Sequence, residues 1–322
     1  MQEIPLQEIV PFRIGQTENA AAGTGCTVIL CPDGMRAGLD VRGGGPASRD
    51  SQMLNPLMAM ETIHGVVLAG GSAFGLDAAG GVMRFLEERG VGFDVGVTKV
   101  PLVVQSCLFD LTAGDADVRP DAAMGYEAAR LAWDAPNFRD GNFGAGCGAT
   151  VGKWEGMACC MKSGIGSYAL QAGSLQIGAV AAVNALGDVF DWRDGRQIAG
   201  LLSPDKKSLR STAAEMAKKT EARENKFLTN TTLAAVITNA AFTKTQLCKI
   251  AGMAQNGLAR CIDPVHTSAD GDSIYALSAG TLSADQDLAG TLAARAVSEA
   301  VLRAVLSAES AYGYPAAKDL MP

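Results

Sequence analysis

The chain has 322 residues, of which 48% are hydrophobic and 19% are charged, and its net charge at pH 7 is −7. This composition excludes a disordered chain, because it supplies enough apolar side chains for a large buried core. The modest negative charge, without a basic stretch interleaved with aromatic residues, argues against a nucleic-acid partner.

Local patterns indicate a soluble, cytoplasmic protein with no membrane partner. The start of the chain, MQEIPLQEIVPF, lacks the basic segment and apolar run of a signal peptide. The longest apolar stretches, such as 177–187, are shorter than the roughly 20 residues that a membrane-spanning helix needs. The eight cysteines form no C-x-x-C pair and only two histidines are present. We therefore expect reduced, buried cysteines, with no metal and no cofactor.

Short apolar runs rich in β-branched residues alternate with alanine-rich segments along the chain. In chain order, the pattern predicts strands at 26–31, 35–42 and 65–70, helices at 73–90 and 122–133, strands at 176–191 and 231–240, and helices at 244–262 and 288–310. The last two helices carry apolar residues at spacings of three and four, which is typical of a helix with one buried face. The alternation predicts an α/β fold with helices layered on sheet.

The segment 203–227 differs from its surroundings, because it is dense in Lys, Arg and Glu and poor in large apolar residues. It predicts an exposed linker, helical or mobile. The predicted strand at 231–240 follows it almost at once. A chain can be cut at such a junction without losing its fold, although an ordinary surface loop has the same composition.

Asn230 and Thr231 stand at this junction and offer a specific chemistry. The Thr231 hydroxyl could attack the Asn230 carbonyl, moving the acyl group from nitrogen to oxygen, and water would then release the ester. The product is an N-terminal threonine whose α-amine, with a reference pKa near 8, can act as the base beside its own hydroxyl. This route needs no histidine.

Asp270 and Asp272 lie two residues apart in the motif DGD. The rest of an EF-hand calcium loop is missing, so the pair does not predict a calcium site. Two neighbouring carboxylates perturb each other's ionisation, which suits the orientation or activation of a hydroxyl nucleophile. A turn without a catalytic role is the alternative.

A second nucleophile candidate is Ser72 in LAGGSAFG, at a predicted turn between strand and helix. The G-x-S-x-G pattern of a nucleophile elbow fails here, because Gly75 comes one residue too late. A serine hydrolase built from Ser72 would need His266, which is the only histidine downstream of it.

Several segments together resemble one family, the L-aminopeptidase/D-esterase (DmpA-type) hydrolases, which include β-peptidyl aminopeptidases and nylon-oligomer hydrolases. The resembling segments, in the order of the family, are LDVRGGGPASRD (39–50), IHGVVLAGGSAFGLDAAGGVMRFLEERGVGF (63–93), LFDLTAGD (108–115), GNFGAGCGATVGK (141–153), VNALGDV (183–189), NTTLAAVITNAAFTK (230–244) and VHTSADGDSIYALSAG (265–280). They span nearly the whole chain.

The resemblance implies a four-layer α-β-β-α sandwich of the N-terminal-nucleophile type, shared with ornithine acetyltransferases. It implies a single hydrolase domain, 1–322, that cuts itself into 1–230 and 231–322 and forms a homotetramer of cleaved protomers. The implied activity is hydrolysis of amide or ester bonds in small peptides or amino-acid amides, through an acyl-Thr231 intermediate.

The resemblance also implies roles for individual residues. Thr231 matches the nucleophile, and Asn184 matches the residue that steadies the oxyanion. Asp270 and Asp272 match the positions that orient and activate the nucleophile, and Lys153 matches a lysine near the nucleophile in the nylon-hydrolase branch.

Two residues depart from the family pattern. Cys147 stands where relatives often carry threonine, and Asp77 stands where a small apolar residue is expected. These departures keep an uncleaved, non-catalytic homologue as an alternative. An acyltransferase of the ornithine-acetyltransferase kind is a further alternative, because it uses the same type of self-generated threonine.

Overall fold

The computed structural model describes residues 1–219 and 230–320 of the chain. Its framework is a ten-stranded sheet that bends at one long strand, β3 (Thr24–Val41), and so forms two layers, which are called the first and the second sheet. Residues 36–41 of β3 pair with one sheet and residues 24–30 pair with the other. The first sheet contains β1 (Gln2–Glu3), β11 (Ile165–Ala172), β12 (Leu175–Asn184), β15 (Thr231–Ala240) and β17 (Ser273–Leu282). The second contains β2 (Arg13–Asn19), β4 (Ala47–Arg49), β5 (Ile63–Ala69) and β8 (Val103–Cys107).

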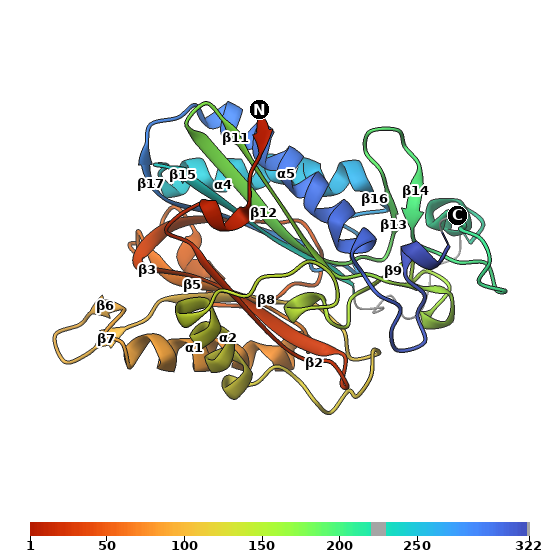
Figure 1. The fold of residues 1–322 in the computed structure, drawn as a ribbon, viewed down its shortest axis with the longest axis horizontal. Coiled ribbons are helices and arrows are strands. Elements are labelled where there is room, and N and C mark those ends of the chain that lie inside the picture. The colour runs from red at the N-terminus through yellow and green to blue at the C-terminus, as the bar shows by residue number, and fades with distance from the viewer. Residues whose placement is uncertain (220–229, 321–322) are drawn as a thin grey trace.

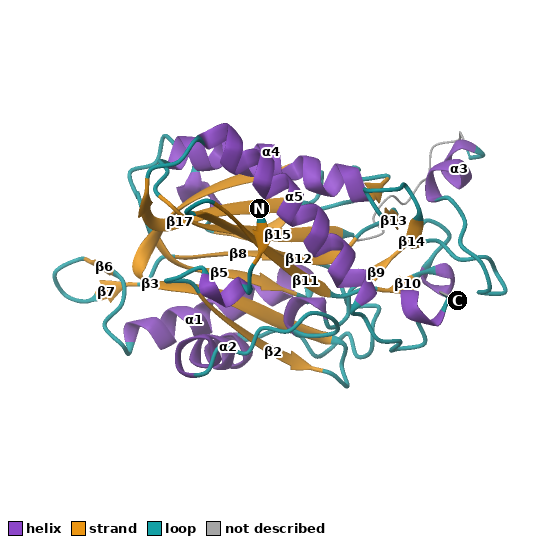
Figure 2. Cartoon of the chain, turned by 45° about the horizontal axis from the view of Figure 1, so that its top comes forward, coloured by secondary structure: helices purple, strands orange, loops and turns teal. Residues whose placement is uncertain are grey.

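Helices cover the outer face of each sheet (Figures 1 and 2). The pair α4 (Lys244–Cys261) and α5 (Gln286–Leu306) lies on the first sheet, and the pair α1 (Ala78–Glu87) and α2 (Ala122–Asp134) lies on the second. Three apolar cores separate the four layers, one under each helix pair and one between the two sheets. The predicted four-layer α-β-β-α sandwich is confirmed.

The helices form where apolar residues recur at helical spacing and a capping residue stands at the start. In α4 the side chains of Leu247, Ile250 and Leu258 face the core. The helix begins with a capping box, in which Thr243 accepts from the Gln246 N–H and Gln246 accepts from the Thr243 N–H. The predictions for α2, α4 and β15 are confirmed to within a residue or two.

Other boundaries differ from the sequence predictions. The two strands expected at 26–31 and 35–42 are one strand, because the turn-like residues between them form a bulge at Gly34, whose φ is +88°. The run at 176–191 breaks after Asn184, and β13 (Asp188–Phe190) starts separately. The helix expected at 73–90 opens as a 3-10 helix, Ser72–Asp77, before α1 begins.

Shorter elements lie around this framework. They are β6 (Phe93–Asp94), β7 (Lys99–Val100), β9 (Thr150–Val151), β10 (Met161–Lys162), β14 (Gln197–Ala199), β16 (Ile262–Asp263), α3 (Thr212–Ala217) and the 3-10 helices Leu6–Glu8, Ser51–Leu54, Gly144–Gly146, Met157–Cys159 and Ala317–Asp319. Buried Asp188 of β13 links α3 to the chain that follows β14, because it accepts from the Thr212 N–H at 2.6 Å and from the Leu201 N–H at 2.8 Å. It thereby anchors the start of the charged segment 203–227, whose residues 220–227 lie outside the described part of the chain.

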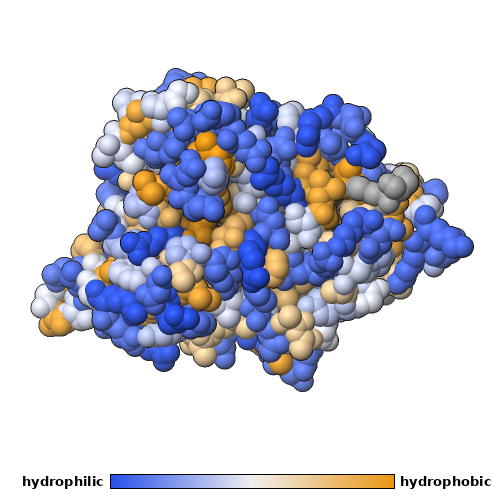
Figure 3. Space-filling model, viewed as in Figure 1, coloured by the Kyte–Doolittle hydropathy of each residue, from blue (hydrophilic) through white to orange (hydrophobic). Residues whose placement is uncertain are grey.

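The face of the molecule in Figure 3 is mainly hydrophilic, and most of the cysteines are buried, as expected. Smaller apolar areas are scattered over this face. Six of the eight free cysteines are buried as expected, whereas Cys159 and Cys248 are partly exposed. Within residues 1–219 and 230–320, no helix is both long enough and apolar enough to cross a membrane.

Candidate active site

The peptide bond between Asn230 and Thr231 lies buried at the start of β15, where three neighbouring groups fix it. The Thr231 hydroxyl donates to the carbonyl oxygen of Asn230. The Gly271 N–H donates to the same oxygen at 2.9 Å, and the Asn230 N–H donates to the Ala269 carbonyl at 3.3 Å. The nucleophile and the carbonyl that it would attack are therefore already in contact, and a backbone donor polarises that carbonyl.

Gly271 approaches the threonine so closely that a larger residue would require the Thr231 side chain to move. A methyl group added to its Cα would lie 2.6 Å from Thr231 Oγ1, and the next atom would be the Gly45 carbonyl oxygen at 3.0 Å. Glycine at this position therefore serves the approach of Thr231, since only that side chain lies closer than 3.0 Å.

Asp270 and Asp272, on either side of Gly271, have different partners, and each is 1% exposed. Asp270 accepts from Thr267, through the N–H at 2.8 Å and the hydroxyl at 2.5 Å. Burial, followed by the charge of Asp272, raises the pKa of Asp270 to about 6. Asp272 accepts from the N–H of Thr232 at 2.7 Å, so it holds the residue that directly follows the nucleophile.

Asn184 and Lys153 lie on the β12 side of Thr231, whereas the two aspartates lie on the β17 side. Asn184 is the last residue of β12 and pairs with Thr231 across β12 and β15. Its Oδ1 accepts from Lys153 Nζ at 2.8 Å and from the Thr150 N–H at 3.1 Å, while its Nδ2 donates to the Phe109 carbonyl at 2.9 Å. Burial lowers the pKa of Lys153 to about 7, although nearby carboxylates oppose this shift. The structure thus gathers all five predicted catalytic residues around one peptide bond.

A small pocket of about 70 Å³ opens onto Thr231. Its walls are Gly45, Ala47, Ser72, Cys107, Phe109, Asn230, Thr231, Ser268 and Ala269. Ser72 therefore shares the pocket with Thr231. It does not pair with His266, whose Nδ1 contacts Asp272 at 2.9 Å and whose Nε2 has no hydrogen-bond partner in the described part of the chain. The arrangement that a Ser72–His266 hydrolase requires is absent from the described residues.

The two departures from the family pattern lie outside the walls of this pocket. Cys147 is buried in the glycine-rich loop, with its Sγ 3.4 Å from the Tyr312 hydroxyl. Asp77 is exposed at the end of the 3-10 helix that precedes α1. Among the described residues, neither side chain is hydrogen-bonded to Asn230, Thr231 or the five catalytic candidates.

Sequence reasoning missed three contributors to the site: the Gly271 N–H, the Thr267 hydroxyl and the Thr150 N–H. Gly271 carried a signal, because it separates the two aspartates of the DGD motif. Thr267 precedes Asp270 by three residues, a spacing that allows a local side-chain hydrogen bond. The contact of Thr150 with Asn184 joins residues 34 apart and had no local signal.

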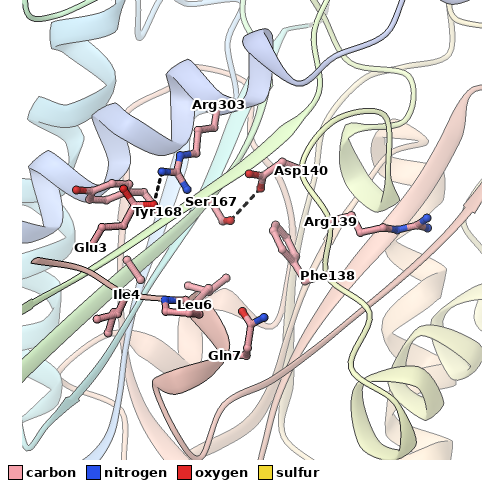
Figure 4. A pocket seen from close by; sticks show the side chains of 12 residues that line it. Glu3, Ile4, Leu6, Gln7, Phe138, Arg139, Asp140, Ser167, Tyr168 and Arg303 are labelled. Carbon is pink, nitrogen blue, oxygen red and sulfur yellow. Dashed lines mark hydrogen bonds and ion pairs between the residues drawn. The ribbon is translucent and has the colours of Figure 1, made fainter.

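A larger cavity, of about 490 Å³, lies elsewhere, beside β1, β11 and α5 (Figure 4). Arg303 pairs with Glu3 across it at 2.5 Å, and Asp140 accepts from the Ser167 hydroxyl at 2.9 Å. None of the five catalytic candidates lines this cavity. It is therefore separate from the pocket at Thr231.

Comparison with known proteins identifies one family, whose sequence pattern matches nearly the whole chain. The sequence pattern of Peptidase family S58 matches residues 9–318. An uncharacterized aminopeptidase of Mycobacterium leprae (strain TN) is 38% identical, over 96% of this chain and 90% of the relative. A 6-aminohexanoate-oligomer endohydrolase of Agromyces sp. (strain KY5R) is 30% identical, over 90% of this chain and 83% of the relative.

A solved structure supports the same fold. The L-aminopeptidase D-Ala-esterase/amidase from Ochrobactrum anthropi, described as a variant of the Ntn hydrolase fold, superimposes with a TM-score of 0.67. It is 17% identical, over 94% of this chain and 86% of that one. At this identity the likeness concerns the arrangement of the chain and not the chemistry.

Proposed function

Because the chain belongs to peptidase family S58, and because Thr231 lies against the carbonyl before it, we propose a self-processing amidohydrolase that cuts its own Asn230–Thr231 bond. The freed Thr231 then serves as the N-terminal nucleophile. At the level of the family, the chain is a hydrolase of the aminopeptidase and amidase type. The observation that carries the finer proposal is the buried contact of the Thr231 hydroxyl and the Gly271 N–H with one carbonyl oxygen.

Self-cleavage begins when Thr231 Oγ1 attacks the carbonyl carbon of Asn230. The carbon–nitrogen bond breaks, the nitrogen takes up the proton that the hydroxyl gave to a base, and an ester joins Asn230 to Thr231 Oγ1. Water then hydrolyses the ester, giving the Asn230 carboxylate and a free Thr231. The Gly271 N–H, 2.9 Å from the carbonyl oxygen, supports this route because it can stabilise the oxyanion.

The first step needs a base other than the nitrogen of Thr231, because that nitrogen is still part of an amide. Lys153 and Asp270 are the candidates, because Lys153 Nζ contacts Asn184, the strand partner of Thr231, and Asp270 pairs with Asn230. Burial also shifts their pKa values to about 7 and about 6, so that each can be deprotonated near neutral pH. After cleavage the α-amine of Thr231 is free, and its pKa near 8 suits the same task.

In the mature enzyme, Thr231 attacks the substrate carbonyl, the amine product leaves, and water releases the acid from Thr231. Asn184 supports this step, because a primary amide has two hydrogens and, among the described residues, its Nδ2 donates to the Phe109 carbonyl alone. The names of the relatives, an aminopeptidase and a hydrolase of aminohexanoate oligomers, point to small peptides and amino-acid amides as substrates.

Intact mass spectrometry of the purified wild-type protein tests the proposal. We expect two fragments, residues 1–230 and 231–322, with Thr231 at the new N-terminus. A rapidly quenched reaction with an activated acyl ester should add the acyl mass to the fragment 231–322, and free acid should accumulate. An active sample that stays a single chain would overturn the proposal. Transfer of the acyl group to an added amine in place of water would indicate an acyltransferase.

Gly271→Ala is expected to slow self-cleavage by about 10²-fold, because the new methyl group must displace Thr231 Oγ1 from the carbonyl. The Gly271 N–H remains in this variant, so a loss measures the position of the nucleophile and not the loss of a backbone donor. Cleavage is followed by denaturing electrophoresis over time.

Gly80→Ala is the matched control, since a methyl group there meets no atom closer than 3.7 Å. It should process like the wild type. If Gly271→Ala folds with an unchanged melting temperature and is cut at the wild-type rate, the close approach of Gly271 has no role in cleavage.

A further inference from the structure

His266 lies in the loop between β16 and β17 and is bound twice to one carboxylate oxygen. Its backbone N–H is 3.1 Å from Asp272 Oδ2, and its ring Nδ1 is 2.9 Å from the same oxygen. The φ of His266 is +56°, a left-handed conformation that is uncommon for a residue with a side chain. The loop is therefore shaped so that both groups of one residue reach Asp272.

Asp272 connects this loop to the nucleophile strand. Its other oxygen, Oδ1, accepts from the Thr232 N–H at 2.7 Å. Its carbonyl oxygen accepts from the N–H groups of Arg42 and Gly43, so its backbone is held as well. Asp272 Oδ1 thus holds the residue that follows Thr231, and His266 holds the other oxygen of Asp272, Oδ2.

The hydrogen bonding of the ring indicates how it acts. Because the Asp272 carboxylate accepts, Nδ1 carries the hydrogen, and in the neutral ring Nε2 is then an acceptor. Nε2 is buried, and among the described residues it has no hydrogen-bond partner. The ring is therefore arranged to hold Asp272 and does not contact Thr231 or Ser72 as a base.

We propose that His266 is a positioning residue, which locks the Asp272 carboxylate against the Thr232 N–H and thereby aligns Thr231 for attack. This inference rests on the proposed function, because alignment matters only if Thr231 is the nucleophile. It gives the second histidine of the chain a role that does not involve proton transfer to the substrate.

The test compares His266→Asn with His266→Gln and His266→Ala. The amide of Asn places an N–H near the position of Nδ1 and tolerates a left-handed backbone, whereas the amide of Gln reaches the position of Nε2. His266→Asn should be cut at a rate within about 3-fold of the wild-type rate. His266→Gln and His266→Ala should be cut about 10²-fold more slowly than the wild type, as expected when a reacting group is misplaced. In material that has been fully processed, kcat should fall in the Gln and Ala variants while KM stays near the wild-type value.

A double variant shows whether His266 acts through Asp272. In an Asp272→Ala background, His266→Ala should cause no further loss, because the carboxylate that it positions is gone. Equal rates for His266→Asn and His266→Gln, or additive losses in the double variant, would overturn the proposal. A wild-type chain that is never cut would instead remove the proposed function itself, so the two failures are distinguishable.

Discussion

Thr231→Ala is expected to remain one chain of 322 residues and to have no measurable hydrolase activity. The variant lacks the oxygen that attacks the Asn230 carbonyl and that later carries the acyl group. Loss of a nucleophile commonly lowers kcat by roughly 10⁶-fold, which would leave this enzyme below detection. The fold should be retained, since the Asn230 carbonyl still accepts from the Gly271 N–H. Denaturing electrophoresis, intact mass and an assay with an amino-acid amide measure the three outcomes.

The adjacent threonine provides the matched control. Thr232 is buried, and its hydroxyl has no hydrogen-bond partner in the part of the chain that the structure describes. Valine has the shape of threonine, and Thr232→Val keeps the backbone N–H that donates to Asp272. This variant should therefore be cut and active. Thr231→Ser should also be cut, because it keeps a hydroxyl. Cleavage of Thr231→Ala after residue 230 would refute the assignment of the nucleophile.

The sequence predicted the layers of the fold better than the limits of its strands. Helices such as α2 and α4 were found because an alanine-rich segment, and in α4 the spacing of the apolar residues, are local features. The bend of β3 was missed, because the residues at 32–34 are typical of a turn and only the pairing with β5 and β17 keeps the strand continuous. The break of β12 after Asn184 was missed for the same reason, since the apolar run continues through it.

Thr231 and the DGD pair were singled out by their own chemistry, whereas Asn184 and Lys153 came from the resemblance alone. Lys153, Asn184, Thr231 and the DGD pair lie far apart along the chain, and no local pattern brings them together. The structure adds contacts and burial that arise only when distant parts of the chain come together. These additions are the Gly271 N–H on the scissile carbonyl, the His266 ring on Asp272, and burial, which brings the pKa of Lys153 to about 7. Whether these contacts perform self-cleavage remains a prediction.

Lys153→Met is expected to slow self-cleavage by about 10²–10³-fold and to change its dependence on pH. A base acts when it is deprotonated, so the wild-type rate should be low below the pKa values of Asp270 and Lys153, rise through about pH 6 to 7, and level off above. Methionine keeps the apolar length of the side chain but removes the amine. The rise near pH 7 should therefore disappear, leaving at most the part that belongs to Asp270.

The measurement is a pH jump. Precursor that is purified below about pH 5, where both bases are protonated, is transferred to buffers of rising pH, and the fragments are quantified by electrophoresis. Lys244→Met is the control, because Lys244 is also buried and donates to three carbonyl groups, of Met53, Asn55 and Met58. It should lose stability and yet keep the wild-type pH profile. An unchanged profile in Lys153→Met would exclude Lys153 as the base and leave Asp270 to deprotonate Thr231 before the bond is cut.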